Sequence, residues 1–197
     1  MSKIAIFYKL GYTTLIGFFT CTLSFAEPVH QHGVANVNIV ISKQDLIIEL
    51  ETPADNVLGF EHEPRTEQQQ QHLDTSLLLL KDVDSLMTIS SAALCEIRHV
   101  EIDNPFASDT KDDGHHEKHD EHSLDAHGDH DDHEVHSDFD IRYTYYCQQP
   151  SRLSIIDLAG LFKHFPNFTK LNAQWLYQNI QSAKRVTKKE SQINFKK

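Results

Sequence analysis

Residues 29–41, VHQHGVANVNIVI, alternate between apolar and polar side chains, and this pattern decides the expected fold. One face would carry Val29, Ala35, Val37, Ile39 and Ile41, and the other face would carry His30, His32, Val34, Asn36 and Asn38. A period of two is typical of a strand with one buried face. The segment therefore predicts a half-buried strand with two histidines on its polar face.

The segments that follow extend this pattern into a sheet. Residues 42–45, SKQD, predict a hairpin turn, and residues 46–50, LIIEL, predict the returning strand. Further strand patterns cover residues 86–89, 92–102, 139–147, 152–158 and 168–177, and residues 182–197 would add an edge strand or fray.

Helices are expected in two places. Residues 64–81 would begin with Pro64 in the first turn and bury a stripe of leucines, and residues 159–165 would end before Pro166. Residues 52–60, TPADNVLGF, are expected to form a turn-rich connection. The fold class is therefore α+β, with a mainly antiparallel sheet of about six or seven strands and two helices.

The first 26 residues have the features of a signal peptide. Lys3 and Lys9 precede a short apolar segment, and residues 24–26, SFA, fit a cleavage site with small residues. The apolar segment is too short to span a membrane comfortably, so no membrane anchor is expected after cleavage. Residues 27–197 would then form a single domain, interrupted by an insert at residues 103–138.

The charge of the chain favours cations as partners. The 197 residues carry a formal net charge of −11, and loss of the two signal-peptide lysines changes it to −13. Such a surface argues against nucleic acid or an anionic membrane as a partner.

The insert is the most unusual part of the composition. Residues 111–139 read KDDGHHEKHDEHSLDAHGDHDDHEVHSDF, with almost no apolar side chain, so this stretch cannot fold alone and is expected to be disordered. Eight of the fourteen histidines of the chain lie within it: His115, His116, His119, His122, His127, His130, His133 and His136. Histidines this dense make a merely solvated linker a poor explanation.

Neutral imidazoles interleaved with carboxylates are the donors that zinc prefers in proteins. His115, His119 and His122 would line one face of a helix, and the spacing of three from His127 to His136 also lets neighbouring imidazoles share an ion. Copper or nickel would also bind such a stretch in vitro. The alternative is a pH sensor, because eight imidazoles would gain charge together in mild acid.

Two cysteines, Cys95 and Cys147, remain after signal cleavage and flank the insert. In an oxidising compartment they predict one disulfide, which would hold the two ends of the histidine-rich stretch together. The competing interpretation is that both are thiolate zinc ligands.

Three histidines outside the insert are further metal candidates. His30 and His32 are two apart on a strand and share a face, so they could chelate one ion, although a solvated N-terminus explains them almost as well. His62 lies between two glutamates at an expected helix start, where a surface role is the common one. No helix with a His-Glu-x-x-His motif, nucleophile elbow or phosphate-binding loop is present, so no catalytic residue is assigned and the protein is not expected to be an enzyme.

Several of these motifs together resemble a known family. They are His30-x-His32-Gly33, Glu51-x-Pro53-Ala54, the segment LGFEHEPRT at residues 58–66, and a histidine- and aspartate-rich insert between Cys95 and Cys147. This pattern resembles the ZrgA-type periplasmic zinc-uptake proteins of Gram-negative bacteria. The resemblance implies a periplasmic accessory protein that binds zinc for an uptake system, with His30, His32 and His62 at matching positions.

The leading hypothesis is therefore a non-catalytic protein that collects or buffers zinc in the periplasm. Its partners would be divalent metal ions and components of a zinc transport system. A pH- or metal-gated interaction module is the second hypothesis, and an exported metallohydrolase is the third.

Overall fold

The computed structural model describes residues 31–107 and 137–195. The expected signal peptide, His30 and all eight histidines of the insert lie outside the described residues. His32, His62 and both cysteines lie within them, as do the strands on either side of the insert.

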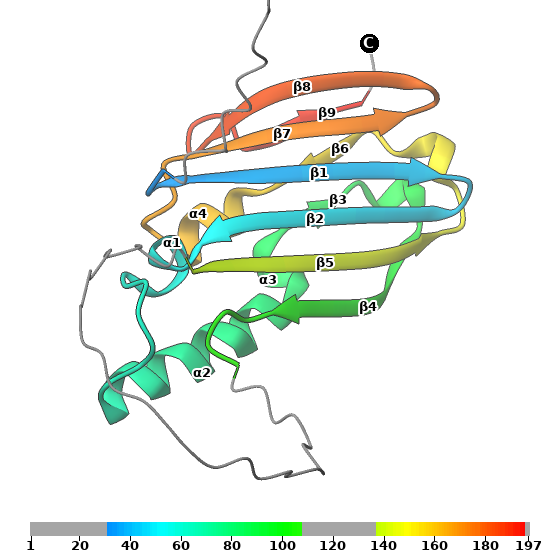
Figure 1. Cartoon of the computed structure of the whole chain (residues 1–197). Coiled ribbons are helices and arrows are strands. Elements are labelled where there is room, and N and C mark those ends of the chain that lie inside the picture. Colours follow the sequence, from blue (N-terminus) through cyan, green and yellow to red (C-terminus); the bar gives the residue numbers. More distant parts are fainter. Residues whose placement is uncertain (1–30, 108–136, 196–197) are drawn as a thin grey trace, which may run out of the picture.

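The centre of the fold is a six-stranded sheet with the order β4-β5-β2-β1-β7-β8 (Figure 1). Its strands are β1 (Val34–Ser42), β2 (Asp45–Pro53), β4 (Cys95–Asp103), β5 (Asp138–Cys147), β7 (Lys170–Tyr177) and β8 (Ile180–Thr187). All neighbours are antiparallel except β1 and β7, which run parallel. The expected mainly antiparallel sheet is therefore confirmed, with one parallel pair, β1 and β7, in its interior.

The remaining elements lie on one face of this sheet (Figure 1). A second sheet has the order β3-β6-β9 and consists of β3 (Thr88–Ile89), β6 (Ile155–Asp157) and β9 (Gln192–Asn194). The helices are α1 (Ala54–Leu58), α2 (Glu67–Lys81), α3 (Val83–Leu86) and α4 (Ala159–His164), with short 3-10 turns at Ser91–Ala93 and Pro150–Arg152. None of the described elements covers the other face of the large sheet, which we call the open face.

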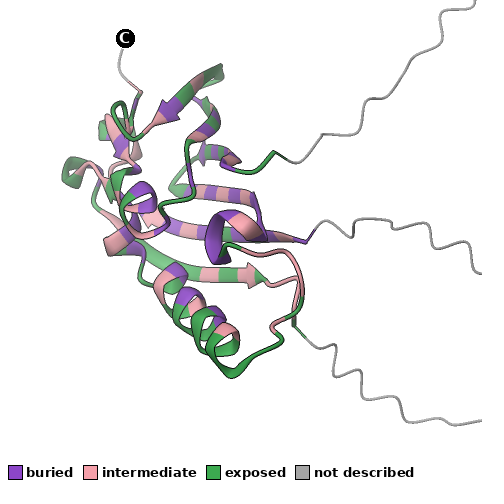
Figure 2. Ribbon diagram, turned by 90° about the vertical axis from the view of Figure 1, so that its left-hand side faces the viewer, coloured by how far each residue is buried: buried purple, intermediate pink, exposed green. Residues whose placement is uncertain are grey.

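The core lies between the large sheet and these covering elements. Along β1, Ala35, Val37, Ile39 and Ile41 are buried, as the alternating sequence predicts. The same alternation holds in β5, where Phe139, Ile141, Tyr143, Tyr145 and Cys147 face inward. Helix α2 turns Leu73, Ser76 and Leu80 toward the core and exposes its other side (Figure 2).

Tight turns and caps explain several element boundaries. The β1–β2 hairpin turns at Lys43, whose φ of 54° lies in the left-handed region that tight hairpins require. Helix α2 begins at Glu67 and not at Pro64, because the hydroxyl of Thr66 accepts a hydrogen bond from the backbone N–H of Gln69 and caps the helix.

Four expectations about local structure are wrong. Strand β1 begins at Val34, after the left-handed Gly33, so His32 lies in a turn before the strand and not on its polar face. Residues 52–60 contain the end of β2 and helix α1 in place of a turn-rich connection. Residues 83–86 form α3, so the strand expected at residues 86–89 shrinks to Thr88–Ile89, because the buried side chains of Val83 and Leu86 have helical spacing. The described residues hold nine strands and four α-helices, where six or seven strands and two helices were predicted.

The disulfide between Cys95 and Cys147 is confirmed as a bridge between paired strands, but it does not hold the ends of the histidine-rich stretch together. The two residues are directly paired across β4 and β5, with Cα atoms 3.9 Å apart. The insert leaves the sheet at the opposite end of this hairpin, where Asp103 pairs with Asp140. Strand pairing, and not the disulfide itself, brings the ends of the insert together.

Candidate metal centre

One end of the large sheet gathers the motifs that the sequence singled out, and we call it the histidine end. Here β1 and β5 begin, β2 and β4 end, and α1 follows β2 (Figure 1). Both described neighbours of the insert lie at this end. The carbonyl of Ser137 accepts a 2.8 Å hydrogen bond from the N–H of Ala54, and the ring of Phe106 lies 6.5 Å from that of Phe60. The histidine-rich insert is thus attached at the end of the sheet that also carries His32 and His62.

His32 lies between two carboxylates at this end. Its Nε2 atom is 3.1 Å from Oε1 of Glu61, and its Nδ1 atom is 3.7 Å from Oδ2 of Asp55. The imidazole is 62% exposed, whereas the side chains of Asp55 and Glu61 are only about one quarter exposed. The cluster is therefore open to an ion on the imidazole side and held by the domain on the carboxylate side.

A buried amide fixes the backbone that carries His32. Asn56, on α1, is only 1% exposed and accepts a hydrogen bond from the N–H of Gly33. Its side-chain NH₂ group donates to the carbonyl of Val34 and to the hydroxyl of Thr52, both at 2.9 Å. Because Asn56 follows Asp55 directly, one short helix both supplies a carboxylate and anchors the chain beside His32.

The loop before β7 holds Gly33 from the other side. The hydroxyl and the N–H of Thr169 both donate to the carbonyl of Gly33 at 2.8 Å. Gly33 has a φ of 80°, and a Cβ atom on it would lie 2.8 Å from the Thr169 hydroxyl. A glycine is therefore required after His32, both for its left-handed conformation and for this close approach.

His62 lies on the connection between α1 and α2 and faces a different set of contacts. Its ring stacks on Phe60 at 5.1 Å, and its Nδ1 atom is 2.8 Å from the carbonyl of Glu63. Since a carbonyl can only accept, Nδ1 carries a proton in this contact, and in the neutral ring Nε2 would be the free donor atom. This tautomer is the one that many metal-binding histidines adopt.

Within residues 31–107 and 137–195, no group of three or more His, Cys, Asp or Glu side chains is arranged to hold a metal ion. His32 and His62 remain candidates, and the metal roles of His30 and the insert histidines stay predictions. Asp55 and Glu61 were missed by sequence reasoning. Glu61 is visible beside His62, but no local pattern indicates that it contacts a side chain 29 positions earlier.

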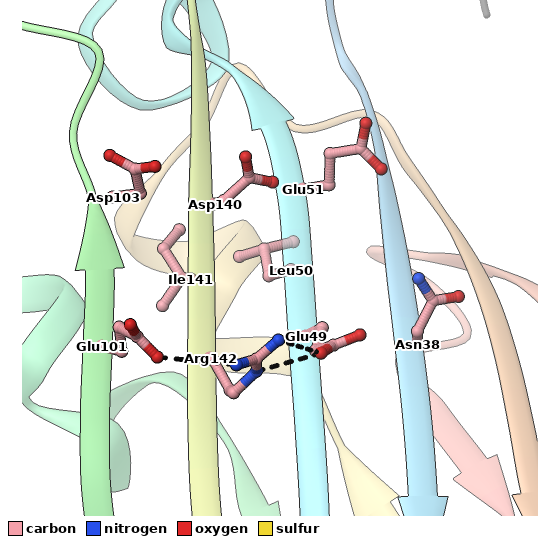
Figure 3. Close-up of a pocket in the computed structure, with 9 residues that line it drawn as sticks. All are labelled: Asn38, Glu49, Leu50, Glu51, Glu101, Asp103, Asp140, Ile141 and Arg142. Carbon is pink, nitrogen blue, oxygen red and sulfur yellow. Dashed lines mark hydrogen bonds and ion pairs between the residues drawn. The ribbon is translucent and has the colours of Figure 1, made fainter.

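The open face next to the histidine end carries a row of acidic side chains (Figure 3). Glu51, Asp140 and Asp103 are directly paired across β2, β5 and β4. One step further along the strands, Arg142 bonds to Glu49 at 2.9 Å and lies 3.6 Å from Glu101. Together with Asn38, these residues line a shallow hollow of about 380 Å³.

The pKa of Asp140 is raised above its ordinary value. Partial burial is the largest cause, and the negative charges of Glu51 and Asp103 add to it. Like charges directly opposite each other in a sheet destabilise it slightly. The row gives the open face a negative field beside the attachment points of the insert.

A disulfide-linked α+β domain with a histidine between two carboxylates, at the attachment end of a histidine-rich insert, has the features of a metal-binding protein. The family model described as "ZrgA family zinc uptake protein" matches residues 29–195, so the chain belongs to this family of zinc uptake proteins. A search of curated proteins found no significant match. The family supports zinc as the ion that the protein handles. No helix among the described residues is long and apolar enough to cross a membrane.

Proposed function

We propose that this protein is a non-catalytic, periplasmic zinc-binding accessory protein that collects or buffers zinc for an uptake system. The observation that carries the proposal is the membership of a zinc uptake family over residues 29–195. The histidine-rich insert supplies the donors, and the folded domain displays that insert from the end of a sheet. Components of a zinc transport system would receive the ion.

The chemistry of the insert supports collection of several ions. Its eight imidazoles are donors of intermediate softness and its carboxylates are hard donors, and zinc binds both kinds. Two to four of these donors could share one ion in several combinations, without one fixed geometry. Sites of this kind exchange metal readily, which a protein that passes zinc onward requires. The acidic row on the open face would attract cations toward the same end of the sheet.

A test of the insert must leave the described fold intact. Among the described residues, the core side chains lie at positions 35–58, 73–93, 139–177, 186 and 193. Removing residues up to 138 would cut into β5 and break the hydrogen bond between Ser137 and Ala54. Substitution of the insert histidines is therefore a cleaner test than deletion.

The experiment compares residues 27–197 with the same chain after an eightfold substitution, which we call the eight-site variant: His115→Asn, His116→Asn, His119→Asn, His122→Asn, His127→Asn, His130→Asn, His133→Asn and His136→Asn. Native mass spectrometry with added zinc should show several ions on the unsubstituted chain and at most one on the eight-site variant. Circular dichroism should show the same fold for both. Equal zinc stoichiometry in the two chains would refute the role of the insert.

A further inference from the structure

Besides the insert, the folded domain contains a second feature suited to zinc. We propose that His32, through Nε2, and the carboxylate of Glu61 are the protein donors of a zinc site, and that Asp55 orients the His32 ring. This inference rests on the proposed role in zinc handling, and it adds a defined site in the folded domain to that role.

The distance between the two donor atoms fits one zinc ion. Zinc binds imidazole nitrogen and carboxylate oxygen at about 2.0–2.1 Å, so two donors on one tetrahedral ion lie about 3.3 Å apart. Nε2 of His32 and Oε1 of Glu61 are 3.1 Å apart. An ion could enter between them with small adjustments of two side chains. Without metal, the same contact serves as an ion pair when His32 is protonated.

Asp55 occupies the position of an orienting group. A histidine that binds zinc usually donates its other ring N–H to a carboxylate or carbonyl, and this contact fixes the tautomer and strengthens the ligand. Oδ2 of Asp55 is 3.7 Å from Nδ1 of His32, which is within ion-pair distance but longer than a hydrogen bond. His32 thus has a carboxylate near each ring nitrogen, and a small shift of the Asp55 side chain would bring it into hydrogen-bond range of Nδ1.

The backbone around the site holds both sides of this arrangement. Asn56 ties α1 to Gly33, and the side-chain amide of Asn167 donates to the carbonyl of Asp55 at 2.8 Å. His32 and Asp55 are therefore fixed relative to each other by buried or directional hydrogen bonds. Glu61 lies on the connection after α1, just beyond the left-handed Gly59 that ends this helix.

Two protein donors leave the remaining zinc positions to water. Such a site is expected to bind one ion weakly and to exchange it fast. This behaviour suits a point of passage between the insert and a recipient, and it does not suit a structural zinc, which is normally enclosed by four protein donors.

The test uses the full mature chain of the eight-site variant, titrated with zinc alone and followed by calorimetry. One weak site is expected. His32→Ala and Glu61→Gln should each lower its affinity at least tenfold, and Asp55→Asn should lower it by roughly 10–100-fold. His99→Ala, which removes an exposed histidine on β4, is the matched control and should leave the affinity unchanged.

Long-range ¹H–¹⁵N spectra of the His32 ring separate ligation from a merely structural contact. Zinc should shift Nε2 and leave Nδ1 protonated, and Asp55→Asn should raise the share of the other tautomer in the absence of zinc. Ligation through Nδ1, no zinc binding to the eight-site variant, or binding that His32→Ala does not change would each overturn the inference. These outcomes are distinct from a failure of the proposed function, in which the unsubstituted chain would bind no more zinc than the eight-site variant.

Discussion

The two ends of the β4–β5 hairpin are built from different chemistry. At one end, Cys95 and Cys147 are covalently joined, and Cys147 is almost fully buried. At the other end, the insert is attached, and the neighbouring side chains are histidines and carboxylates that solvent can reach. Eight residues of β4 are paired with residues of β5 from one end of the hairpin to the other, so the two ends lie about 25 Å apart.

The disulfide and the candidate zinc donors therefore lie at opposite ends of the same sheet. The disulfide closes a loop with a sequence separation of 52 residues, which contains the whole insert, without touching the candidate zinc donors. Changes at the disulfide end should therefore act on stability alone, and changes at the histidine end should act on zinc binding as well.

The largest effect is expected from the double variant Cys95→Ala, Cys147→Ala. Removing a cross-link of this loop length costs about 4 kcal/mol of unfolding free energy in the chain-entropy treatment. Urea unfolding of the two chains measures the loss. Zinc affinity of the folded double variant should remain unchanged, and a parallel loss of affinity would show that the two ends are coupled.

Asn56→Ala should cost about 2–3 kcal/mol, because it leaves the N–H of Gly33 and the carbonyl of Val34 without their buried partner. Unlike the cysteine variant, it should also weaken zinc binding at His32, since the backbone that carries this residue is released. Urea unfolding and zinc calorimetry on the eight-site variant check the two effects. Asn172→Ala on the open face is the control, expected to lie within about 0.5 kcal/mol of the parent chain.

Tyr143→Phe tests the middle of the hairpin. The fully buried hydroxyl of Tyr143 donates to the carbonyl of Leu80 at 3.0 Å, near the end of α2, and burial raises the pKa of this phenol. Loss of the hydroxyl should lower the unfolding free energy by about 1–2 kcal/mol. Zinc affinity should not change. Tyr146→Phe, on the opposite face of the same strand, should have a smaller effect, and equal losses would contradict this assignment.

Asp140→Asn should have the smallest effect and the opposite sign. It removes one charge from the row with Glu51 and Asp103 and should raise the unfolding free energy at pH 7 by about 0.5 kcal/mol, a small value because the side chain is largely solvated. Since the pKa of Asp140 is raised in the folded state, the folded chain binds this proton more tightly than the unfolded chain. The advantage of the variant should therefore shrink as the pH falls through that raised pKa. Urea unfolding of both chains at pH 7 and near pH 4 measures the difference in unfolding free energy. A difference that grows in acid would contradict repulsion of the ionised Asp140 as its cause.

Alternating patterns predicted the central strands well, because each has one face against a dense core. From Val34 onward, the buried side chains of β1 match the expected face, and the strand expected at residues 139–147 is found as β5 with the same alternation. The pattern failed in β4, where a bulge between Ile97 and His99 shifts the register and leaves Ile97 exposed. A bulge inserts one residue into one strand, and a period-two pattern contains no signal for it.

The candidate site shows the same limit more strongly. His32 and His62 were found from their residue type and motif, whereas Asp55 and Glu61 depend on a contact that tertiary structure creates. The segment containing Asp55 was predicted as a turn because Pro53 and Gly59 are common in turns. In the fold, these two residues frame the short helix α1, with Pro53 before it and a left-handed Gly59 after it.

The parallel pairing of β1 with β7 also has a consequence for the order of folding. Strand β1 meets β2 through a tight hairpin, but its other neighbour is 136 positions away along the chain. Pairings of such long range form slowly, because the loop-closure entropy must be overcome before the contacts form. Thr169, just before β7, holds the backbone of Gly33, so the backbone next to His32 reaches its final conformation only when β7 has paired with β1.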